Sequence, residues 1–120
     1  MKRLLELNLT LQNELMTTVR LTTGGVCSCF GLTLDESEDC KLCVTEALLL
    51  LTRNGFQTAR VVFCEEEGLQ VILKGELREG ARENSVEEDI SCALLEALVE
   101  NLSIERDGEG VCAVSFRFGS

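Results

Sequence analysis

A chain of 120 residues with 21 acidic and 11 basic side chains, and a formal net charge of −10, has the length of one domain. Its acidity disfavours nucleic-acid and anionic-lipid partners, and no apolar run approaches the roughly 18 residues of a membrane span. The hydrophobic share of 45%, with five Phe and no Trp or Tyr, predicts a single domain over residues 1–120 whose core is built mainly of Leu, Val, Ile and Ala.

The chain opens with a predicted strand and helix. Leu5, Leu7 and Leu9 alternate with polar residues, which is typical of a half-buried strand. Apolar residues then recur at helical spacing between about residues 13 and 30. Gly24-Gly25 lies inside this segment and would weaken the helix by about 1 kcal/mol per glycine.

A second helix has the clearest signals. Asp35 with Glu38 forms a capping-box pattern at its start, and Asn54-Gly55 favours a left-handed residue at its end. Residues 48–51 are all Leu and cover every side of one turn. We therefore expect this helix to lie at the centre of the domain.

A hairpin and a third helix follow. Residues 59–64 and 69–74 have strand patterns around a turn at residues 65–68, and residues 75–85 are expected to form the longest irregular loop. Ser85 with Glu88 forms another capping-box pattern. The helix that it opens is expected to pack through its apolar residues, namely Val86, Ile90, Ala93, Leu94, Ala97 and Leu98.

Two closing strands, residues 102–106 and 111–118, flank a turn at residues 107–110. Residues in the last strand alternate between its two faces, and one face carries Cys112, Val114, Phe116 and Phe118. The predicted order is β-α-α-β-β-α-β-β. It corresponds to an α+β two-layer sandwich of three helices on one mostly antiparallel mixed sheet.

The chain has no His, which is the commonest general base and metal ligand, so Cys is the residue type to consider for metal or redox chemistry. The N-terminal segment MKRLLELNLTLQNEL is interrupted by polar residues and no small-residue cleavage site follows, so we expect a cytoplasmic protein whose seven Cys are buried hydrophobic side chains. Cys64, Cys92 and Cys112 are expected to pack in the core. Cys27-x-Cys29 and Cys40-x-x-Cys43 together hold four thiols, so a thiol metal or redox module stays open as an alternative.

The segment VTEALLLLTRNG, residues 44–55, carries a family resemblance. Together with the element order, it resembles the histidine-kinase-like ATPase family, and within it the bacterial anti-sigma-factor serine kinases, which have SEAVxNAxxHG on the second helix. Glu46-Ala47 and Gly55 occupy matching positions. The closing segment NLSIERDGEGVCAVSFRF is similar in pattern to the family's last two strands. The resemblance covers nearly the whole chain and implies that family's fold and a homodimer.

The same resemblance reveals a missing metal ligand. In the family, the Glu of this motif acts as a base and an Asn four residues later holds Mg²⁺. Here the Glu is present as Glu46, whereas the Asn position is Leu50, which offers no oxygen to a cation that requires oxygen ligands. Glu46 is therefore the one candidate base, and no metal ligand is expected.

Two further motifs depart from the family. Its Asp-x-Gly-x-Gly motif binds adenine, and the nearest segment here is ELREG, residues 76–80. Glu76 is one methylene too long, Arg78 replaces the first glycine and only Gly80 is retained. The family's phosphate-binding glycines before the third helix are also absent, and the acidic residues 87–89 would repel phosphate there.

These departures predict a non-catalytic regulatory protein-binding module that resembles an anti-sigma factor without ATP or Mg²⁺. Its partner would be a regulatory protein such as a sigma factor or an anti-sigma antagonist. The acidic clusters at residues 65–67 and 87–89 would offer a negative surface to a basic partner, and Arg78 with Arg82 could hold an anion. An ATP-dependent serine kinase with unusual ligands is the other alternative that stays open.

Overall fold

The computed structural model describes residues 2–80, 86–99 and 101–119. Its five strands form one sheet in the order β1-β2-β3-β5-β4, and all four strand pairings are antiparallel. The expectation of a mixed sheet is therefore wrong for the described strands. The strand bounds are β1 (Lys2–Thr10), β2 (Phe56–Glu65), β3 (Leu69–Arg78), β4 (Ser103–Asp107) and β5 (Gly110–Phe118).

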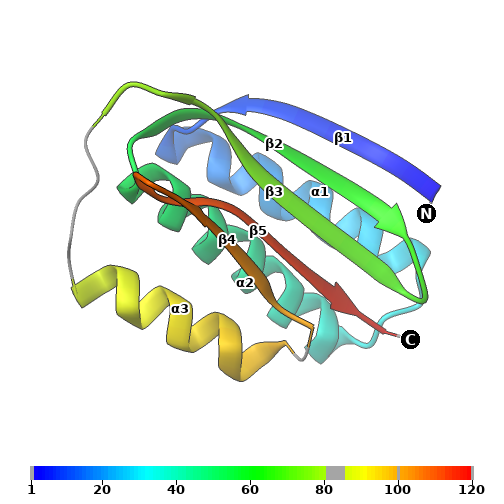
Figure 1. The fold of residues 1–120 in the computed structure, drawn as a ribbon. Coiled ribbons are helices and arrows are strands. Elements are labelled where there is room, and N and C mark those ends of the chain that lie inside the picture. Colours follow the sequence, from blue (N-terminus) through cyan, green and yellow to red (C-terminus); the bar gives the residue numbers. More distant parts are fainter. Residues whose placement is uncertain (1, 81–85, 100, 120) are drawn as a thin grey trace.

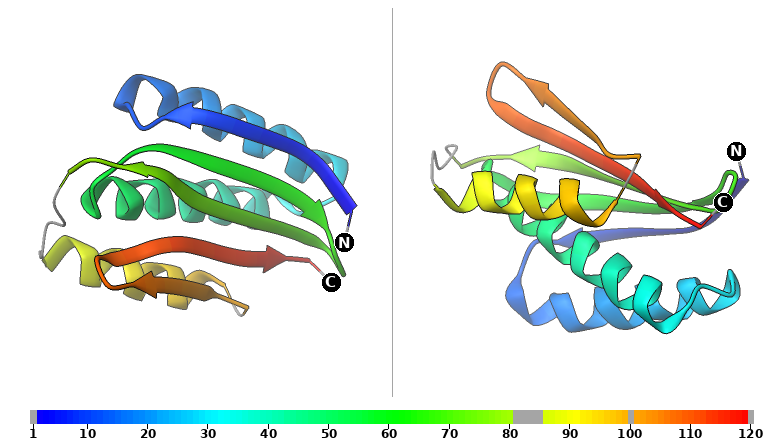
Figure 2. Two further views of the ribbon diagram at one scale, coloured as in Figure 1. Left: turned by 45° about the horizontal axis from the view of Figure 1, so that its top comes forward. Right: turned by 90° about the horizontal axis from the view of Figure 1, so that it is seen from below.

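Three α-helices lie on one side of this sheet, which leaves its other face uncovered by helices (Figures 1 and 2). They are α1 (Met16–Cys29), preceded by the short 3-10 helix η1 (Asn13–Leu15), then α2 (Leu34–Arg53) and α3 (Val86–Leu98). The α+β class and the order of the helices and strands are thus confirmed. Within the described residues, none of the helices combines the length and apolarity that a membrane crossing requires.

Helix α2 lies between the other two helices and against the sheet, as its sequence predicts (Figure 1). Leu48, Leu50 and Leu51 are fully buried, together with Phe63 of β2 and Phe116 of β5. Four consecutive Leu residues can be accommodated because helices or strands contact this turn from several directions.

The start of α2 differs from the prediction. Thr33, not Asp35, is the N-cap: the Thr33 hydroxyl accepts a hydrogen bond from the Glu36 N–H, and the Glu36 carboxylate accepts one from the Thr33 N–H. Thr33 is the N-cap because its backbone is extended directly before the helix, whereas Asp35 already lies inside the helix. Glu38 instead forms an ion pair with Lys41 at 3.0 Å.

Helix α1 continues without a break through Gly24-Gly25, as predicted. The aliphatic stem of Lys41 on α2 lies where a side chain at Gly24 would be, so Gly24 contributes to close packing of the two helices. Gly25 faces open space and has no such role. Tertiary packing therefore outweighs the low helix propensity of glycine at one position.

Strand β3 extends further than predicted. Residues 75–78, expected to begin the long loop, pair with β2 through Gly75 opposite Ala59 and Arg78 opposite Phe56. The register shifts twice in this region, which accounts for the absence of a simple alternating pattern. Residues 79–80 follow the strand without regular structure, and residues 81–85 of the predicted loop, with the Ser85 half of the predicted capping box, lie outside the described residues.

Helix α3 turns a different face inward from the one predicted, although Leu98 of the predicted face does pack against the core. Its buried residues are Glu88, Ser91 and Leu95. Val86 and Ile90, expected in the core, are 69% and 60% exposed, and Ala93 and Ala97 are also exposed. Polar contacts with α2 account for this orientation.

Candidate functional site

Glu46, the candidate base, takes part in a chain of hydrogen bonds between α2 and α3. Its carboxylate accepts a hydrogen bond of 2.9 Å from the Ser91 hydroxyl. The Ser91 oxygen in turn accepts one of 3.0 Å from the Arg53 guanidinium. Ser91 is buried, so the Glu46 carboxylate is held in place by a side chain of the neighbouring helix.

Leu50 lies one turn after Glu46 and is fully buried in the hydrophobic core. Its side chain offers no oxygen to a cation, and its backbone carbonyl is already the acceptor for the Asn54 N–H and the Asn54 side-chain amide. The position where the resemblance implies a magnesium ligand is therefore a packing position in this chain.

Asn54, at the end of α2, is the centre of a second group of contacts. It is fully buried, and its Nδ2 donates to the Leu50 carbonyl at 2.8 Å and to the Glu88 carboxylate at 2.9 Å. Its Oδ1 accepts a hydrogen bond of 2.9 Å from the Val111 N–H. One amide thereby joins α2 to α3 and to the first residues of β5.

Arg78 fills the space next to Asn54. Its Nε donates to the Asn54 carbonyl at 2.9 Å and its Nη2 to the Val111 carbonyl at 3.0 Å. Its Nη1 lies 2.9 Å from Asp107 and 3.0 Å from Glu109. The guanidinium carbon is 4.3 Å from the centre of the Phe56 ring, within cation–π range. These contacts leave the guanidinium engaged with the protein on several sides.

The Arg78 contacts also affect the acidity of Asp107. A hydrogen bond from the Glu109 N–H, followed by the hydrogen bond and positive charge of Arg78, holds the pKa of Asp107 below its ordinary value of 3.8. Asp107 therefore stays ionised at neutral pH and ties the β4–β5 hairpin to β3.

The other two residues of the predicted adenine motif lie apart from each other. Glu76 of β3 forms an ion pair with Arg60 of β2 at 2.8 Å, and Arg60 also lies 3.2 Å from Glu6 of β1. Gly80 instead contacts Gly55 at the end of α2, where the Gly80 N–H donates to the Gly55 carbonyl at 3.0 Å. The retained glycine thus has a packing role within the chain.

The two groups of contacts together define the candidate site, at the C-terminal half of α2. The sequence had singled out Glu46, Leu50, Arg78 and Gly80, which the fold brings to this helix or its C-terminal end. The side chains that complete the site are Arg53, Asn54, Glu88 and Ser91; the sequence had indicated Asn54 and Glu88 only as residues at helix ends, and Arg53 and Ser91 not at all. Glu88 and Ser91 are polar residues spaced by three positions on one face of the helix, and this spacing was the signal that could have identified them.

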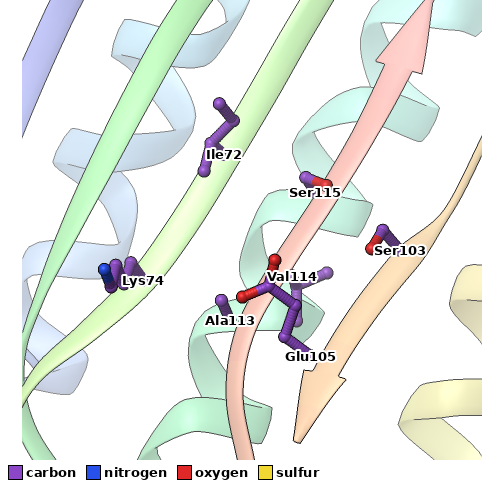
Figure 3. A pocket seen from close by; sticks show the side chains of 7 residues that line it. All are labelled: Ile72, Lys74, Ser103, Glu105, Ala113, Val114 and Ser115. Carbon is purple, nitrogen blue, oxygen red and sulfur yellow. The ribbon is translucent and has the colours of Figure 1, made fainter.

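The helix-free face of the sheet carries a shallow hollow (Figure 3). Ala113 of β5 pairs with Lys74 of β3 on one side and with Glu105 of β4 on the other, and its small side chain leaves the hollow between them. Its volume is about 190 Å³, below the roughly 300–1,000 Å³ of typical small-molecule sites. The lining residues are Ile72, Lys74, Ser103, Glu105, Ala113, Val114 and Ser115.

The Cys residues pack mainly as expected, with Cys29 as the exception. Cys27, Cys40, Cys43 and Cys64 are buried, Cys92 and Cys112 are half-buried against the core, and Cys29 is exposed. A hydrogen bond from the Cys40 thiol lowers the pKa of Cys27 to about 7 and raises that of Cys40, while burial raises the pKa of Cys43 to about 12. Among the described residues, no three Cys, Asp or Glu side chains gather closely enough to hold a metal ion.

No protein-family model matches this chain, and no curated protein is similar enough to assign it to a family.

Proposed function

We propose that this chain is a non-catalytic regulatory protein-binding module, built on a histidine-kinase-like ATPase scaffold that no longer binds ATP or Mg²⁺. In this proposal it is a cytoplasmic protein that resembles an anti-sigma factor. It acts by occupying a surface of a regulatory protein, such as a sigma factor or an anti-sigma antagonist, without phosphoryl transfer.

The observation that carries the proposal is the closure of the space between α2 and α3. The Glu46 carboxylate is held by the Ser91 hydroxyl, and Leu50 is fully buried one turn later. A nucleotide and its cation would have to separate α3 from α2 and break these contacts. Nothing in Leu50 would compensate, because an alkyl side chain cannot replace the water around Mg²⁺.

The Arg78 contacts support the same conclusion at the other end of the site. A kinase with unusual ligands would need a residue that contacts adenine near this strand. The guanidinium instead bonds to Asn54, Asp107, Glu109 and Val111. Binding of adenine there would expose or leave unpaired several groups that are now satisfied, at a cost of about 1–3 kcal/mol for each buried group.

Calorimetric titration with ATP and MgCl₂ tests the proposal. The expected result is no binding in the micromolar range, and no rise in the unfolding temperature when ATP and Mg²⁺ are added together. Micromolar binding would overturn the proposal in favour of the serine kinase, and incorporation of labelled phosphate into a partner protein would identify its reaction.

The alternative function, a thiol metal or redox module, is favoured by one contact between two Cys residues and can be tested separately. Cys27 and Cys40 share a hydrogen bond between α1 and α2, and the Cys27 pKa is lowered to about 7. Metal analysis of the purified protein and a thiol count after denaturation distinguish the two functions. We expect seven free thiols, as many as the chain has Cys, and no bound zinc.

A further inference from the structure

Helix α3 turns two polar residues inward and leaves several apolar residues exposed, which is unusual for a surface helix. Glu88, Ser91 and Leu95 face inward. The opposite side carries Val86, Ile90, Ala93 and Ala97, all of them exposed, and these four residues are named here the α3 stripe. A surface helix normally turns such residues toward the core, so this arrangement leaves apolar area in water with no partner among the described residues.

The spacing of the α3 stripe fits a second helix. Its members follow one another after four, three and four residues, which is the spacing of the apolar seam in a coiled coil. Val86 and Ile90 supply apolar area, while the small side chains of Ala93 and Ala97 let another backbone approach closely. Figure 1 shows α3 at the border of the helix layer, with α2 beside it on one side only.

The charges beside the stripe select the partner. Asp89 and Glu96 are exposed and lie seven residues apart, along one flank of the stripe. The whole chain carries a net charge of −10, so a second copy would bring like charges together along the seam. A helix with basic residues beside its apolar seam would pair with both carboxylates.

We infer that the α3 stripe is the docking surface for a basic amphipathic helix of a partner protein. This inference rests on the proposed function, because it assigns the surface and the chemical class of the regulatory partner. A contact limited to a helix of 13 residues is small, so the complex is expected to be transient, with a dissociation constant in the micromolar range.

The first experiment is a fluorescence-anisotropy titration of the full chain with a labelled helical peptide of about 15 residues, with Leu and Ala at the seam and Lys at its flanks. Ile90→Gln is expected to weaken binding at least about tenfold, because a large apolar side chain no longer reaches the seam. Leu21→Gln is the matched control, since Leu21 on α1 is 72% exposed and far from α3 in sequence; it should leave binding unchanged. Equal effects of the two substitutions would overturn the inference.

The second experiment exchanges the charges. The double variant Asp89→Lys, Glu96→Lys should lose the Lys-flanked peptide and gain binding to an otherwise identical peptide flanked by Glu. Unchanged preference would overturn the proposed partner chemistry. Sedimentation of the unlabelled protein provides the remaining outcome: a dimer that Ile90→Gln dissociates would show that a second copy occupies the stripe, and would also overturn the inference.

These outcomes are separable from a failure of the proposed function. ATP binding would refute the non-catalytic assignment whatever the peptide does. A protein that binds neither ATP nor the basic peptide would refute only the docking surface, and the regulatory partner would then have to use another face.

Discussion

Asn54→Ala is the substitution that most directly tests the described site. The side chain makes three hydrogen bonds, to the Leu50 carbonyl, the Glu88 carboxylate and the Val111 N–H. The Leu50 carbonyl keeps a partner after the substitution, because it also accepts from the Asn54 N–H at 3.1 Å. The Val111 N–H loses this acceptor, and Glu88 loses one donor. Both residues are buried.

The expected loss follows from these two groups. An unsatisfied buried N–H costs about 1–3 kcal/mol, and a hydrogen bond to a charged group contributes about 1.5–3 kcal/mol. We therefore expect Asn54→Ala to lower the free energy of unfolding by about 3–5 kcal/mol, a large part of the roughly 5–15 kcal/mol of a typical domain. A double-mutant cycle with Glu88→Ala should show a coupling of about 1–2 kcal/mol between the two side chains.

Urea denaturation followed by far-ultraviolet circular dichroism measures this loss. The signal must come from the backbone because the chain has no Trp or Tyr, and a reductant is needed for its seven Cys. Asn13→Ala provides a control, since Asn13 is exposed and should change the stability by no more than about 0.5 kcal/mol. A loss below about 1 kcal/mol for Asn54→Ala would refute the reasoning, because it would mean that neither buried group depends on the amide.

Two further predictions concern the same end of the molecule. Gly55→Ala should destabilise the fold by about 2–4 kcal/mol, because Gly55 has φ of 90° and a Cβ there would overlap the Gly80 carbonyl. Gly25→Ala should instead stabilise the fold by about 0.5–1 kcal/mol, because Gly25 faces open space within a helix. Thermal unfolding of both variants would check the contrast. Asp107 should titrate below its ordinary pKa of 3.8 in a carbon-13 NMR experiment, and Arg78→Gln should raise that pKa. Since a lowered folded-state pKa contributes stability that is present above the unfolded pKa, the Asp107 contribution should be complete near pH 5 and disappear as the pH falls through the folded pKa. An unshifted Asp107 in the native chain would contradict the Arg78 geometry.

The regular elements could be predicted because each has a local pattern. The four consecutive Leu residues of α2 indicated a central helix, and Leu48, Leu50 and Leu51 are buried there while Leu49 is half-buried. Asn54-Gly55 indicated its end, and Gly55 has the expected positive φ. The start of α2 was misplaced by two residues, since Thr33-Glu36 and Asp35-Glu38 have the same spacing and only the path of the incoming chain distinguishes them.

The orientation of α3 and most of the candidate site could not be predicted from local patterns. Apolar periodicity alone would turn Val86 and Ile90 inward, whereas the structure turns Glu88 and Ser91 inward to meet groups on α2. Those contacts join residues 34 and 38 positions apart, a separation at which periodicity carries no information. The Glu46–Ser91 and Arg78–Asp107 contacts could not be predicted for the same reason, because each joins distant segments.

The contacts between α2 and α3 have a mechanical consequence. Helices that meet through apolar side chains alone can roll about their own axes at little cost, because such contacts have no preferred direction. The Asn54–Glu88 and Arg53–Ser91 hydrogen bonds are directional, and rolling α3 by half a turn would carry the buried Glu88 carboxylate away from its amide donor. These bonds therefore fix the rotation of α3 against α2, and they keep the α3 stripe exposed to water although the hydrophobic effect favours its burial.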